Sequence, residues 1–460
     1  MGSGVRGEQR VSEALERLRR EVARLLRRSP PGLEPDLWQR AQRECRELVQ
    51  RDVAQQEPGA SWRARSDREI VLPPSSLLFD YQQQLVDALR SWWAGRGSGS
   101  APRAMVALPT GAGKTRTVMY VLLDAFRQRV LARVLWVAPM AELLDQAAEC
   151  VQYLRQRMES SRELVLRFGS SHSTLADTET AVLHFATVQA AARRPKHMLR
   201  RTVPELVVFD EAHQAQARTY RAFLAEARSV ASAGLLGVSA TPGRSDEDET
   251  KDLAWFFGHN LLIPPSLASD PVGRLQEEGI LAQLVFHTIS LPAHAELVRL
   301  SAHTDVSNKV LLEEPTRLWA AGQTAVERAR TGQVIVFGAN VAHCYALAGV
   351  VRALGMEAEV VTYRTKPERR QAALQRFRRG ELRVLVNRSL LATGYDCPAV
   401  TDVVLAAPVR SPILWEQIMG RVLRGPRVGG TEVGHVWELD DHRALHGDVL
   451  SYERYRGEAW

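Results

Sequence analysis

The octapeptide LPTGAGKT at Leu108–Thr115 constrains the fold more than any other part of the sequence, because it directly follows a short apolar run typical of a buried strand. Gly111 and Gly113 let the backbone turn tightly and bring successive N–H groups close to phosphate oxygens. The helix that follows adds the positive end of its dipole. The segment therefore predicts a strand–loop–helix unit that binds phosphate. A glycine-rich turn without a phosphate is the alternative, because the usual pattern has a further glycine where this chain has Leu108.

Four polar residues extend this prediction to a nucleoside triphosphate. Lys114 is placed to reach the β- and γ-phosphates, and the Thr115 hydroxyl is placed to ligate Mg²⁺. Further along the chain an apolar run ends in the string DEAH. Asp210 at that strand end can hold the Mg²⁺ hydration shell, and Glu211 can orient and deprotonate the attacking water. Two solvated acids are the alternative, but GKT in the same chain argues against it. The two strings predict that ATP is bound and hydrolysed.

Lysine usage supports the assignment of Lys114. Only five of the 60 basic residues are lysines, yet one of the five stands in the loop. A compact ammonium group fits between phosphates, and the wider guanidinium of arginine is not an equivalent replacement there.

Length and composition are those of a globular protein with two or three domains. Of the 460 residues, 45% are hydrophobic and 25% are charged. No apolar run reaches the roughly 18 residues of a membrane span, and no hydrophobic segment of the signal-peptide type stands near the first residue. The four cysteines have neither metal-site spacing nor a disulfide pattern. We therefore expect a cytoplasmic protein.

The basic charge is concentrated in the second half of the chain. Residues 315–430 contain 17 Lys and Arg but only 8 Asp and Glu. A basic face suits a polyanion such as nucleic acid. An ordinary arginine-rich surface in contact with solvent is the alternative, and charge alone does not decide between them.

The first 76 residues predict a helical extension and a linker. Apolar residues recur at helical spacing between 11 and 28, and a second amphipathic stretch runs from 37 to 53. Residues 55–76 are polar and contain Pro and Ser. The two helices would either pack on the rest of the chain or dock a partner protein, and packing is the preferred interpretation.

Beyond residue 76 the chain alternates apolar strand-like runs with longer helical stretches, which predicts parallel α/β sheets. The strand candidates are 105–108, 134–138, 182–186, 206–209 and 235–238, and then 334–337, 358–361, 384–386, 403–405 and 436–439. Two such series predict two α/β domains, joined somewhere between residues 243 and 320.

A third string, QIMGRVLR at 417–424, lies in the second series. Gln417, Arg421 and Arg424 follow the i, i+4, i+7 spacing of residues on one face of a helix. Arginines presented together across a domain interface can neutralise the charge that develops on a γ-phosphoryl group. A helix with a solvated basic face is the alternative.

From about residue 77 to 440 the chain resembles the superfamily 2 helicases and translocases, whose motifs occur here in the expected order. The resemblance implies two RecA-like domains in tandem behind the helical extension. The expected domains are 1–76 as extension and linker, 77–265 as the ATP-binding domain, 266–320 as a connecting segment and 321–460 as the second domain. ATP, Mg²⁺ and nucleic acid are the implied cofactors and partner.

The resemblance also assigns the remaining site residues. Glu211 is expected to be the base, and Arg424 the best arginine-finger candidate, with Gln417 and Arg421 beside it. Gln82 matches the residue that reads adenine, and Asp396 matches an ATP-binding residue in the motif at 393–396. The residues that match segments coupling ATP to nucleic acid are His213, Ser239 and Thr241. The expected nucleic-acid contacts are Pro139, Thr187, Gln189, Thr393 and Gly394.

Within the superfamily, the chain is most similar to the branch of RadD-like repair proteins and of type I and type III restriction motor subunits. The spelling of LPTGAGKT, the segment 390–398 and the glutamine that opens the last motif carry this similarity. That branch implies DNA more than RNA, and an ATP-dependent helicase or duplex translocase in DNA repair or antiphage defence. An ATP-gated nucleic-acid clamp or assembly subunit, with a partner protein on the N-terminal helices, is the alternative.

Overall fold

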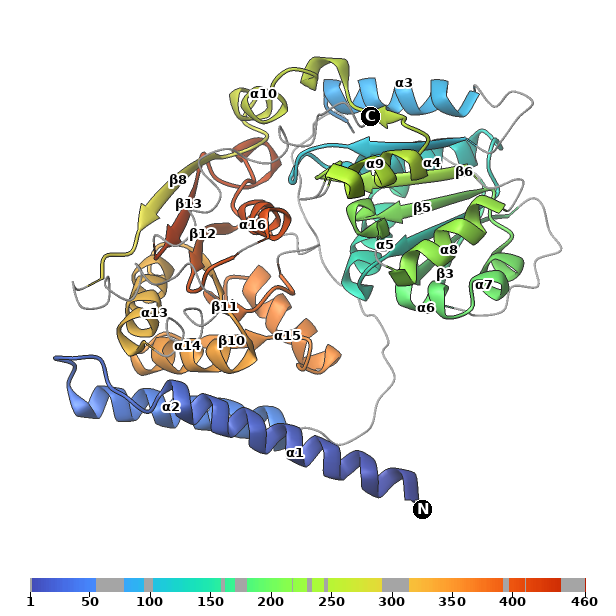
Figure 1. Cartoon of the computed structure of the whole chain (residues 1–460). Coiled ribbons are helices and arrows are strands. Elements are labelled where there is room, and N and C mark those ends of the chain that lie inside the picture. The colour runs from blue at the N-terminus through green and yellow to red at the C-terminus, as the bar shows by residue number, and fades with distance from the viewer. Residues whose placement is uncertain are drawn as a thin grey trace. The chain divides into compact units, whose positions relative to one another are not determined.

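The computed structural model describes residues 2–54, 78–94, 102–158, 162–169, 180–216, 218–229, 234–243, 247–291, 314–391, 397–409, 411–439 and 460. The chain forms two compact units, both of which are α/β (Figure 1). One unit comprises Leu72–Leu281 with Val449–Trp460 and contains the predicted phosphate-binding loop, so we call it the P-loop unit. The other comprises Met1–Val71 with Ala282–Asp448 and contains the hairpin of the two N-terminal helices, so we call it the hairpin unit. None of the described helices is both long and apolar enough to cross a bilayer.

Within the described residues, the P-loop unit has a seven-stranded parallel sheet in the order β3-β4-β2-β5-β6-β1-β7. Its strands are β1 (Arg103–Ala107), β2 (Arg133–Ala138), β3 (Leu164–Phe168), β4 (Ala181–Thr187), β5 (Leu206–Asp210), β6 (Gly234–Ser239) and β7 (Leu261–Leu262). All five strands expected here are confirmed. The sequence missed β3 and β7, because β3 is a partly exposed edge strand and β7 has only two residues.

Helices cover both faces of this sheet, as its buried strands require. Residues 134–138 of β2 are buried without a break, so neither face can meet water. Leu135 and Val137 join one apolar cluster with α6 to α9, while α3, α4 and α5 pack against one another. The helices are α3 (Asp80–Ala94), α4 (Lys114–Arg127), α5 (Ala141–Arg155), α6 (Val188–Arg193), α7 (Pro195–Thr202), α8 (Arg218–Ser229), α9 (Glu247–Phe256) and α10 (Pro271–Glu277).

The hairpin unit has a second sheet, whose six described strands are also parallel and run in the order β10-β11-β9-β12-β13-β8. They are β8 (Gln283–Thr288), β9 (Gln333–Phe337), β10 (Ala358–Val361), β11 (Val384–Asn387), β12 (Val400–Leu405) and β13 (Val433–Glu438). The five strands expected in this half are confirmed. The helices are α1 (Gly2–Leu25), α2 (Pro35–Ala54), α13 (Pro315–Ala329), α14 (Val341–Ala353), α15 (Pro367–Arg378) and α16 (Pro412–Met419).

The structure departs from the expected domains at two places. Trp460, expected in the second domain, belongs to the P-loop unit, where its Nε1 donates to the Pro242 carbonyl at 2.7 Å. The segment 266–320 was expected to connect the two domains, but its residues up to Leu281 belong to the P-loop unit. From Ala282 onward the chain belongs to the hairpin unit, where β8 pairs along its whole length with β13. The strand β8 is not predicted from the sequence, because its residues are exposed or only partly buried, as at an edge strand. The part of the segment at 292–313 lies outside the described residues.

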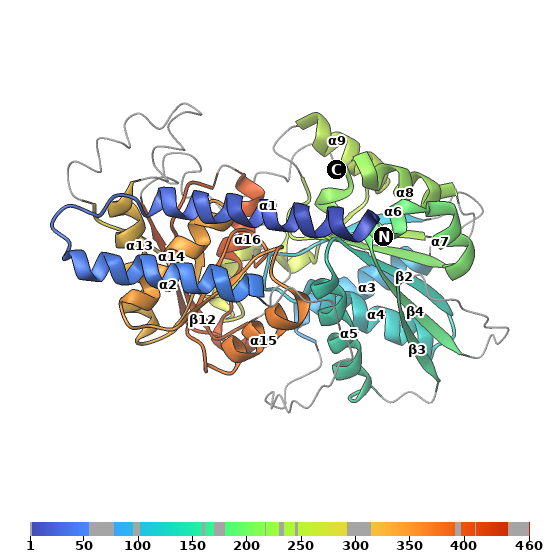
Figure 2. The ribbon, with the colours of Figure 1, turned by 90° about the horizontal axis from the view of Figure 1, so that it is seen from below.

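The helical extension packs on α14, and so confirms the preferred interpretation of residues 1–54. Every residue of α14 except Arg352 is buried, and a helix that is apolar all round needs cover on every side. The strands cover one side, and α1 and α2 lie side by side over the other (Figure 2). The carbonyl of Leu26, just after α1, accepts hydrogen bonds from Trp38 Nε1 at 3.2 Å and Gln42 Nε2 at 2.8 Å. These bonds tie the end of α1 to α2.

Close packing and one ion pair hold α2 against α14, and a second ion pair ties α2 to β10. A Cβ atom added at Gly349 of α14 would stand 2.7 Å from Cys45 Cβ and 2.8 Å from the Ala41 carbonyl, so only glycine permits this approach. Beside this contact Arg352 Nε lies 2.8 Å from Glu44 Oε2, and Arg51 Nη2 lies 2.7 Å from Glu359 Oε2. The extension is therefore an integral layer of its unit.

Gly349→Val is expected to lower the unfolding free energy of the hairpin unit by about 1–3 kcal/mol, the usual cost of overpacking. The added side chain would push α2 away from α14, because two of its three nearest contacts are backbone atoms, which cannot rotate aside. Urea denaturation would measure the loss. Ala372→Val is the matched control, since it adds bulk at an exposed position of α15 and should change stability by less than about 0.5 kcal/mol. Equal values for both variants would contradict the packing argument.

Two buried histidines make stability depend on pH. Burial lowers the pKa of His184 in β4 and of His343 in α14 to about 4, with Arg167 and Arg317 adding to the effect. The folded state thus disfavours their protonation, so the stability they contribute is present above about pH 6.5 and is lost as the pH falls toward 4. Each should cost about 1 kcal/mol between pH 7.0 and 5.5.

Urea denaturation at these two pH values checks this expectation. His343→Gln should reduce the difference in unfolding free energy between pH 7.0 and 5.5 for the hairpin unit. His197→Gln, at an exposed position of α7, should leave that difference unchanged. A pH dependence that survives His343→Gln in full would contradict the assignment.

Candidate active site

The loop after β1 has the conformation that its glycines predict. Gly111 has a φ of 96° and Gly113 a φ of 76°, both in the region that other residues rarely adopt. Gly113 is also the N-cap of α4, so the amide groups at the start of this helix face the loop. A Cβ atom at Gly113 would stand 2.5 Å from Gln82 Nε2. Conformation and space therefore both require glycine at this position.

Two side chains from α3 fasten the loop from behind. The Tyr81 hydroxyl donates to the Ala112 carbonyl at 2.8 Å, and Gln82 Nε2 donates to the same oxygen at 3.1 Å. Gln82 Oε1 accepts from the Phe79 N–H at 3.1 Å. Both side chains are buried. The amide of Gln82 is thus engaged within the chain, and its expected contact with adenine stays a prediction. Tyr81 had no predicted part in holding the loop; its aromatic hydroxyl beside Gln82 was the available signal.

Lys114 and Thr115 open α4, directly beyond the loop. Both are partly exposed, and Lys114 Nζ lies 3.4 Å from the Pro109 carbonyl across the loop. Burial raises the pKa of Asp210, and the charge of Lys114 partly opposes that rise, so the ammonium group lies near the strand end that carries the acids. The Lys114 ammonium group and the N-terminus of α4 therefore both lie near the loop and the end of β5.

Asp210 is the last residue of β5 and is buried. Burial, and next the charge of Glu211, raise the pKa of Asp210, while Lys114 opposes them. Its Oδ1 accepts from the Glu211 N–H at 3.0 Å. The Trp136 indole is near enough to lower the pKa of Asp210, but Oδ2 has no hydrogen bond of ordinary geometry among the described residues. A buried, unsatisfied carboxylate oxygen costs free energy unless something binds it. This oxygen fits an oxygen-ligated cation such as Mg²⁺, and the part of the Thr115 hydroxyl as a second ligand stays a prediction.

A chain of contacts leads from Glu211 to the segment after β6. Glu211 has a φ of 52°, a strained conformation that turns the chain sharply at the strand end. Glu211 Oε2 lies 3.4 Å from His213 Nδ1, and the same nitrogen lies 3.2 Å from Ser239 Oγ. Ser239 Oγ donates to the Thr241 carbonyl at 2.8 Å and accepts from the Thr241 N–H. The three residues expected to act in coupling are thus brought together.

The expected nucleic-acid residues of the first series also stand beyond strand ends. Pro139 follows β2, and Thr187 ends β4 and caps α6 by accepting from the Ala190 N–H at 3.3 Å. Gln189 Nε2 donates to the Tyr220 hydroxyl at 3.1 Å. Because all neighbouring strands are parallel, these residues share the carboxyl edge of the sheet with the loop and Asp210.

The prediction of one helix face for Gln417, Arg421 and Arg424 is wrong. The helix α16 ends at Met419, and Gly420 caps it. Beyond it the chain turns to run beside residues 430–434, where the Thr431 N–H donates to the Arg424 carbonyl at 3.0 Å. Gly430 and Gly434 permit this approach, because a Cβ at either would stand about 2 Å from a carbonyl oxygen of the turn.

The side chains of both arginines donate hydrogen bonds to backbone carbonyls at the end of α16. Arg421 Nε donates to the Gln417 carbonyl at 3.2 Å, and Arg424 Nη1 donates to the Gly420 carbonyl at 3.1 Å. Arg421 and Gln417 are buried, and Arg424 is partly exposed. Thr393, Gly394 and Asp396 lie outside the described residues.

Comparison with known families decides what kind of protein this is. Residues 76–244 match the family described as "Type III restriction enzyme, res subunit", and residues 317–426 match "Helicase conserved C-terminal domain". The chain belongs to the superfamily 2 helicases. Within them it falls in the branch that is like the type III restriction subunits.

Individual superfamily 2 relatives agree with this placement. The chain is 25% identical over 370 residues to "Putative ATP-dependent helicase IRC3" of Saccharomyces cerevisiae, an alignment that covers 76% of this chain and 49% of the yeast protein. It is 23% identical over 379 residues to "DNA 3'-5' translocase XPB2" of Sulfurisphaera tokodaii, covering 75% and 78%. The chain therefore spans about half the length of the yeast relative.

Solved structures show the same fold. The fragment of a putative HsdR subunit of a type I restriction enzyme from Vibrio vulnificus superposes with a TM-score of 0.55 at 19% identity, covering 83% of this chain and 67% of the other. Dbp5 of S. cerevisiae, bound to RNA and ADP BeF3, gives a TM-score of 0.54 at 17% identity and covers 83% and 92%. These likenesses establish two tandem RecA-like domains and nothing finer.

Proposed function

We propose that this chain is a nucleic-acid-stimulated ATPase that couples ATP hydrolysis to movement along DNA, as a helicase or a duplex translocase. The observation that supports this most is the contact chain from Glu211 through His213 to Ser239 and Thr241. It joins the residue expected to activate water to a segment that the family uses to sense nucleic acid. A protein that only bound ATP would have no need for such a connection.

In the proposed reaction the chain's own groups hold the triphosphate and the water. The loop amides and Lys114 bind the phosphates, and Asp210 with Thr115 would hold Mg²⁺, which when bound neutralises phosphate charge. Glu211 accepts the proton of the attacking water, which bonds to the γ-phosphorus as ADP leaves. Arg424, aided by Arg421 and Gln417, stabilises the charge on the transferred phosphoryl group.

Coupling follows from the shared nitrogen of His213. Loss of the γ-phosphate changes the charge beside Glu211, and His213 Nδ1 can pass that change to Ser239. Pro139, Thr187 and Gln189, on the same sheet edge, are the proposed contacts to the nucleic-acid backbone. Such contacts make binding salt-dependent and largely independent of base sequence.

DNA is the proposed partner rather than RNA. Two XPB relatives carry names that specify DNA, and the LlaBIII structure, a restriction enzyme of the same fold, is described as bound to DNA. The basic excess of residues 315–430 suits a polyanion. We propose DNA repair or antiphage defence as the setting, and the cytoplasm as the place of action.

The test is ATP hydrolysis measured without nucleic acid and with duplex DNA, single-stranded DNA or RNA. We expect stimulation of about tenfold or more by DNA, and displacement of a triplex-forming strand as the chain moves along a duplex. Separation of a forked duplex would assign a helicase, and triplex displacement alone a translocase. Binding of DNA in the presence of ATP without stimulated hydrolysis would instead support an ATP-gated clamp and reject the motor.

A further inference from the structure

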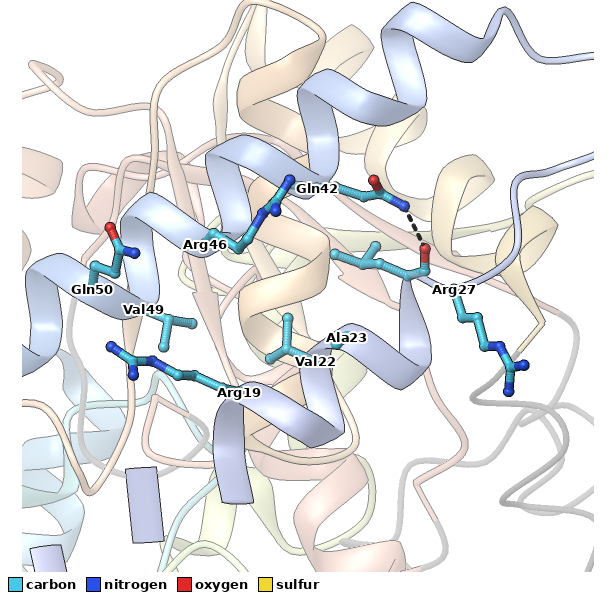
Figure 3. A pocket seen from close by; sticks show the side chains of 9 residues that line it. Arg19, Val22, Ala23, Arg27, Gln42, Arg46, Val49 and Gln50 are labelled. Carbon is cyan, nitrogen blue, oxygen red and sulfur yellow. Dashed lines mark hydrogen bonds between the residues drawn. The ribbon is translucent and has the colours of Figure 1, made fainter. Parts of the chain in front are cut away.

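The hairpin of α1 and α2 carries a groove on the side that faces away from α14. Its volume is about 500 Å³, and side chains from both helices line it (Figure 3). The lining residues are Arg19, Val22, Ala23, Leu26, Arg27, Gln42, Arg46, Val49 and Gln50. Nothing in the proposed ATPase cycle uses this groove.

The floor of the groove is apolar and its ends are defined. Val22, Leu26 and Val49 form the floor, and Ala23 is exposed at its side. At one end the hydrogen bond from Gln42 Nε2 to the Leu26 carbonyl closes the space between the helices. At the other end Arg19 lies beside Val49 and Gln50 (Figure 3). From residue 42 to residue 50, α2 rises about 12 Å, a little over two helical turns.

The rim of the groove is cationic. Arg19, Arg27 and Arg46 all line it, and none of the nine lining residues is acidic. Arg19 Nη1 pairs with Glu16 at 2.6 Å, but both side chains are about half exposed, so this pair contributes little and a competing carboxylate can replace it. Arg46 Nε donates to the Gln42 carbonyl, and within the described part of the chain its terminal nitrogens can still bind another partner. The chemistry is therefore an apolar floor between guanidinium groups.

We propose that this groove docks an acidic amphipathic helix of a partner protein. Such a helix would lay two or three apolar side chains, spaced i, i+4 and i+7, on the floor over about two turns. Its flanking glutamates or aspartates would pair with Arg19, Arg27 and Arg46, in the bidentate geometry that guanidinium groups favour. Because α1 and α2 are an integral layer of the hairpin unit, a partner held there is carried by the motor itself.

Two other occupants fit less well. A nucleic-acid backbone offers phosphates to the arginines but no apolar side chain to fill the space between the two helices. A second copy of the chain, placed symmetrically, would bring the same three arginines against each other, and like charges at such a distance repel. Charge and polarity together thus favour an acidic, partly apolar helix.

The probe for the test is a short fluorescent peptide with leucines at i, i+4 and i+7 and glutamates beside them, titrated with the full chain without ATP. We expect saturable binding that weakens with salt. A peptide with glutamine in place of each glutamate should bind at least about tenfold more weakly. Arg27→Glu and Arg46→Glu should each weaken binding about tenfold, and Ala23→Glu should abolish it. Arg43→Glu, an equal charge change on α2 outside the groove, is the matched control and should have little effect.

Thermal unfolding of each variant separates loss of the groove from loss of the fold, and the two arginine variants remain informative if Ala23→Glu does not fold. No saturable binding, or equal binding by Arg43→Glu and Arg27→Glu, would overturn the proposal. Labelled duplex DNA whose binding falls with the same variants would identify a nucleic-acid surface instead. A concentration-dependent dimer that these variants abolish would identify self-association. None of these readouts depends on ATPase activity, so the proposed function stands or falls separately.

Discussion

Glu211→Gln is expected to reduce the ATP turnover rate by about 10²–10⁴-fold, while ATP and DNA still bind. Glutamine keeps the size of the side chain and an oxygen that can stay near His213, but it cannot accept a proton from water. The change therefore removes the chemical step and leaves the contacts of the ground state. Single-turnover hydrolysis gives the rate, and a fluorescent ATP analogue gives the affinity.

Glu247→Gln is the control for this experiment. It makes the same change on a side chain of α9 that is 82% exposed, and turnover should match the wild type. If Glu211→Gln hydrolyses ATP within tenfold of the wild-type rate, another group activates the water. The contacts between Glu211, His213 and Ser239 would then be structural only.

Arg424→Ala is expected to cut DNA-stimulated turnover on the order of 10³-fold, the effect of removing an arginine finger, with ATP affinity largely unchanged. Arg424→Lys should lose nearly as much, because an ammonium group lacks the planar fork that contacts two phosphate oxygens at once. The measurement is the steady-state ATPase rate at saturating DNA, with thermal unfolding to confirm that loss of the bond to Gly420 leaves the fold intact.

Arg427→Ala is the control, because Arg427 is an exposed arginine three residues further on. This variant should not change the DNA-stimulated turnover rate. Normal turnover in Arg424→Ala would remove this residue from the proposed role. A loss in Arg421→Ala alone would assign the role to the buried neighbour instead.

The sequence predicted the inner strands well and the edges poorly. Strands such as β2 and β9 are buried on both faces and read as unbroken apolar runs, which one sequence is enough to recognise. The edge strands β3 and β8 have mixed burial and a weak pattern, so only their pairing with β4 and β13 reveals them. Local periodicity cannot report a pairing between residues far apart in the chain.

The site shows the same division. The positive φ at Gly111 and Gly113 and the position of Asp210 at a strand end follow from local sequence. The end of α16 does not, because it depends on Gly430 and Gly434 opening a path beside the turn. The hydrogen bond from the Tyr81 hydroxyl to the Ala112 carbonyl likewise joins residues far apart in the sequence. Such a contact forms only in the folded unit, and local sequence does not predict it.

The discontinuous hairpin unit has a consequence for synthesis on the ribosome. Its first two helices leave the exit tunnel long before α14, since roughly 290 residues separate Ala54 from Val341. At 5–20 residues per second, these helices wait on the order of 15–60 s for the surface that buries their apolar faces. Leu18, Val22 and Leu48 are buried in the folded unit but exposed to water throughout that interval. The nascent chain therefore presents an arginine-rich helix pair with an exposed apolar face, which chaperones or a partner protein can bind.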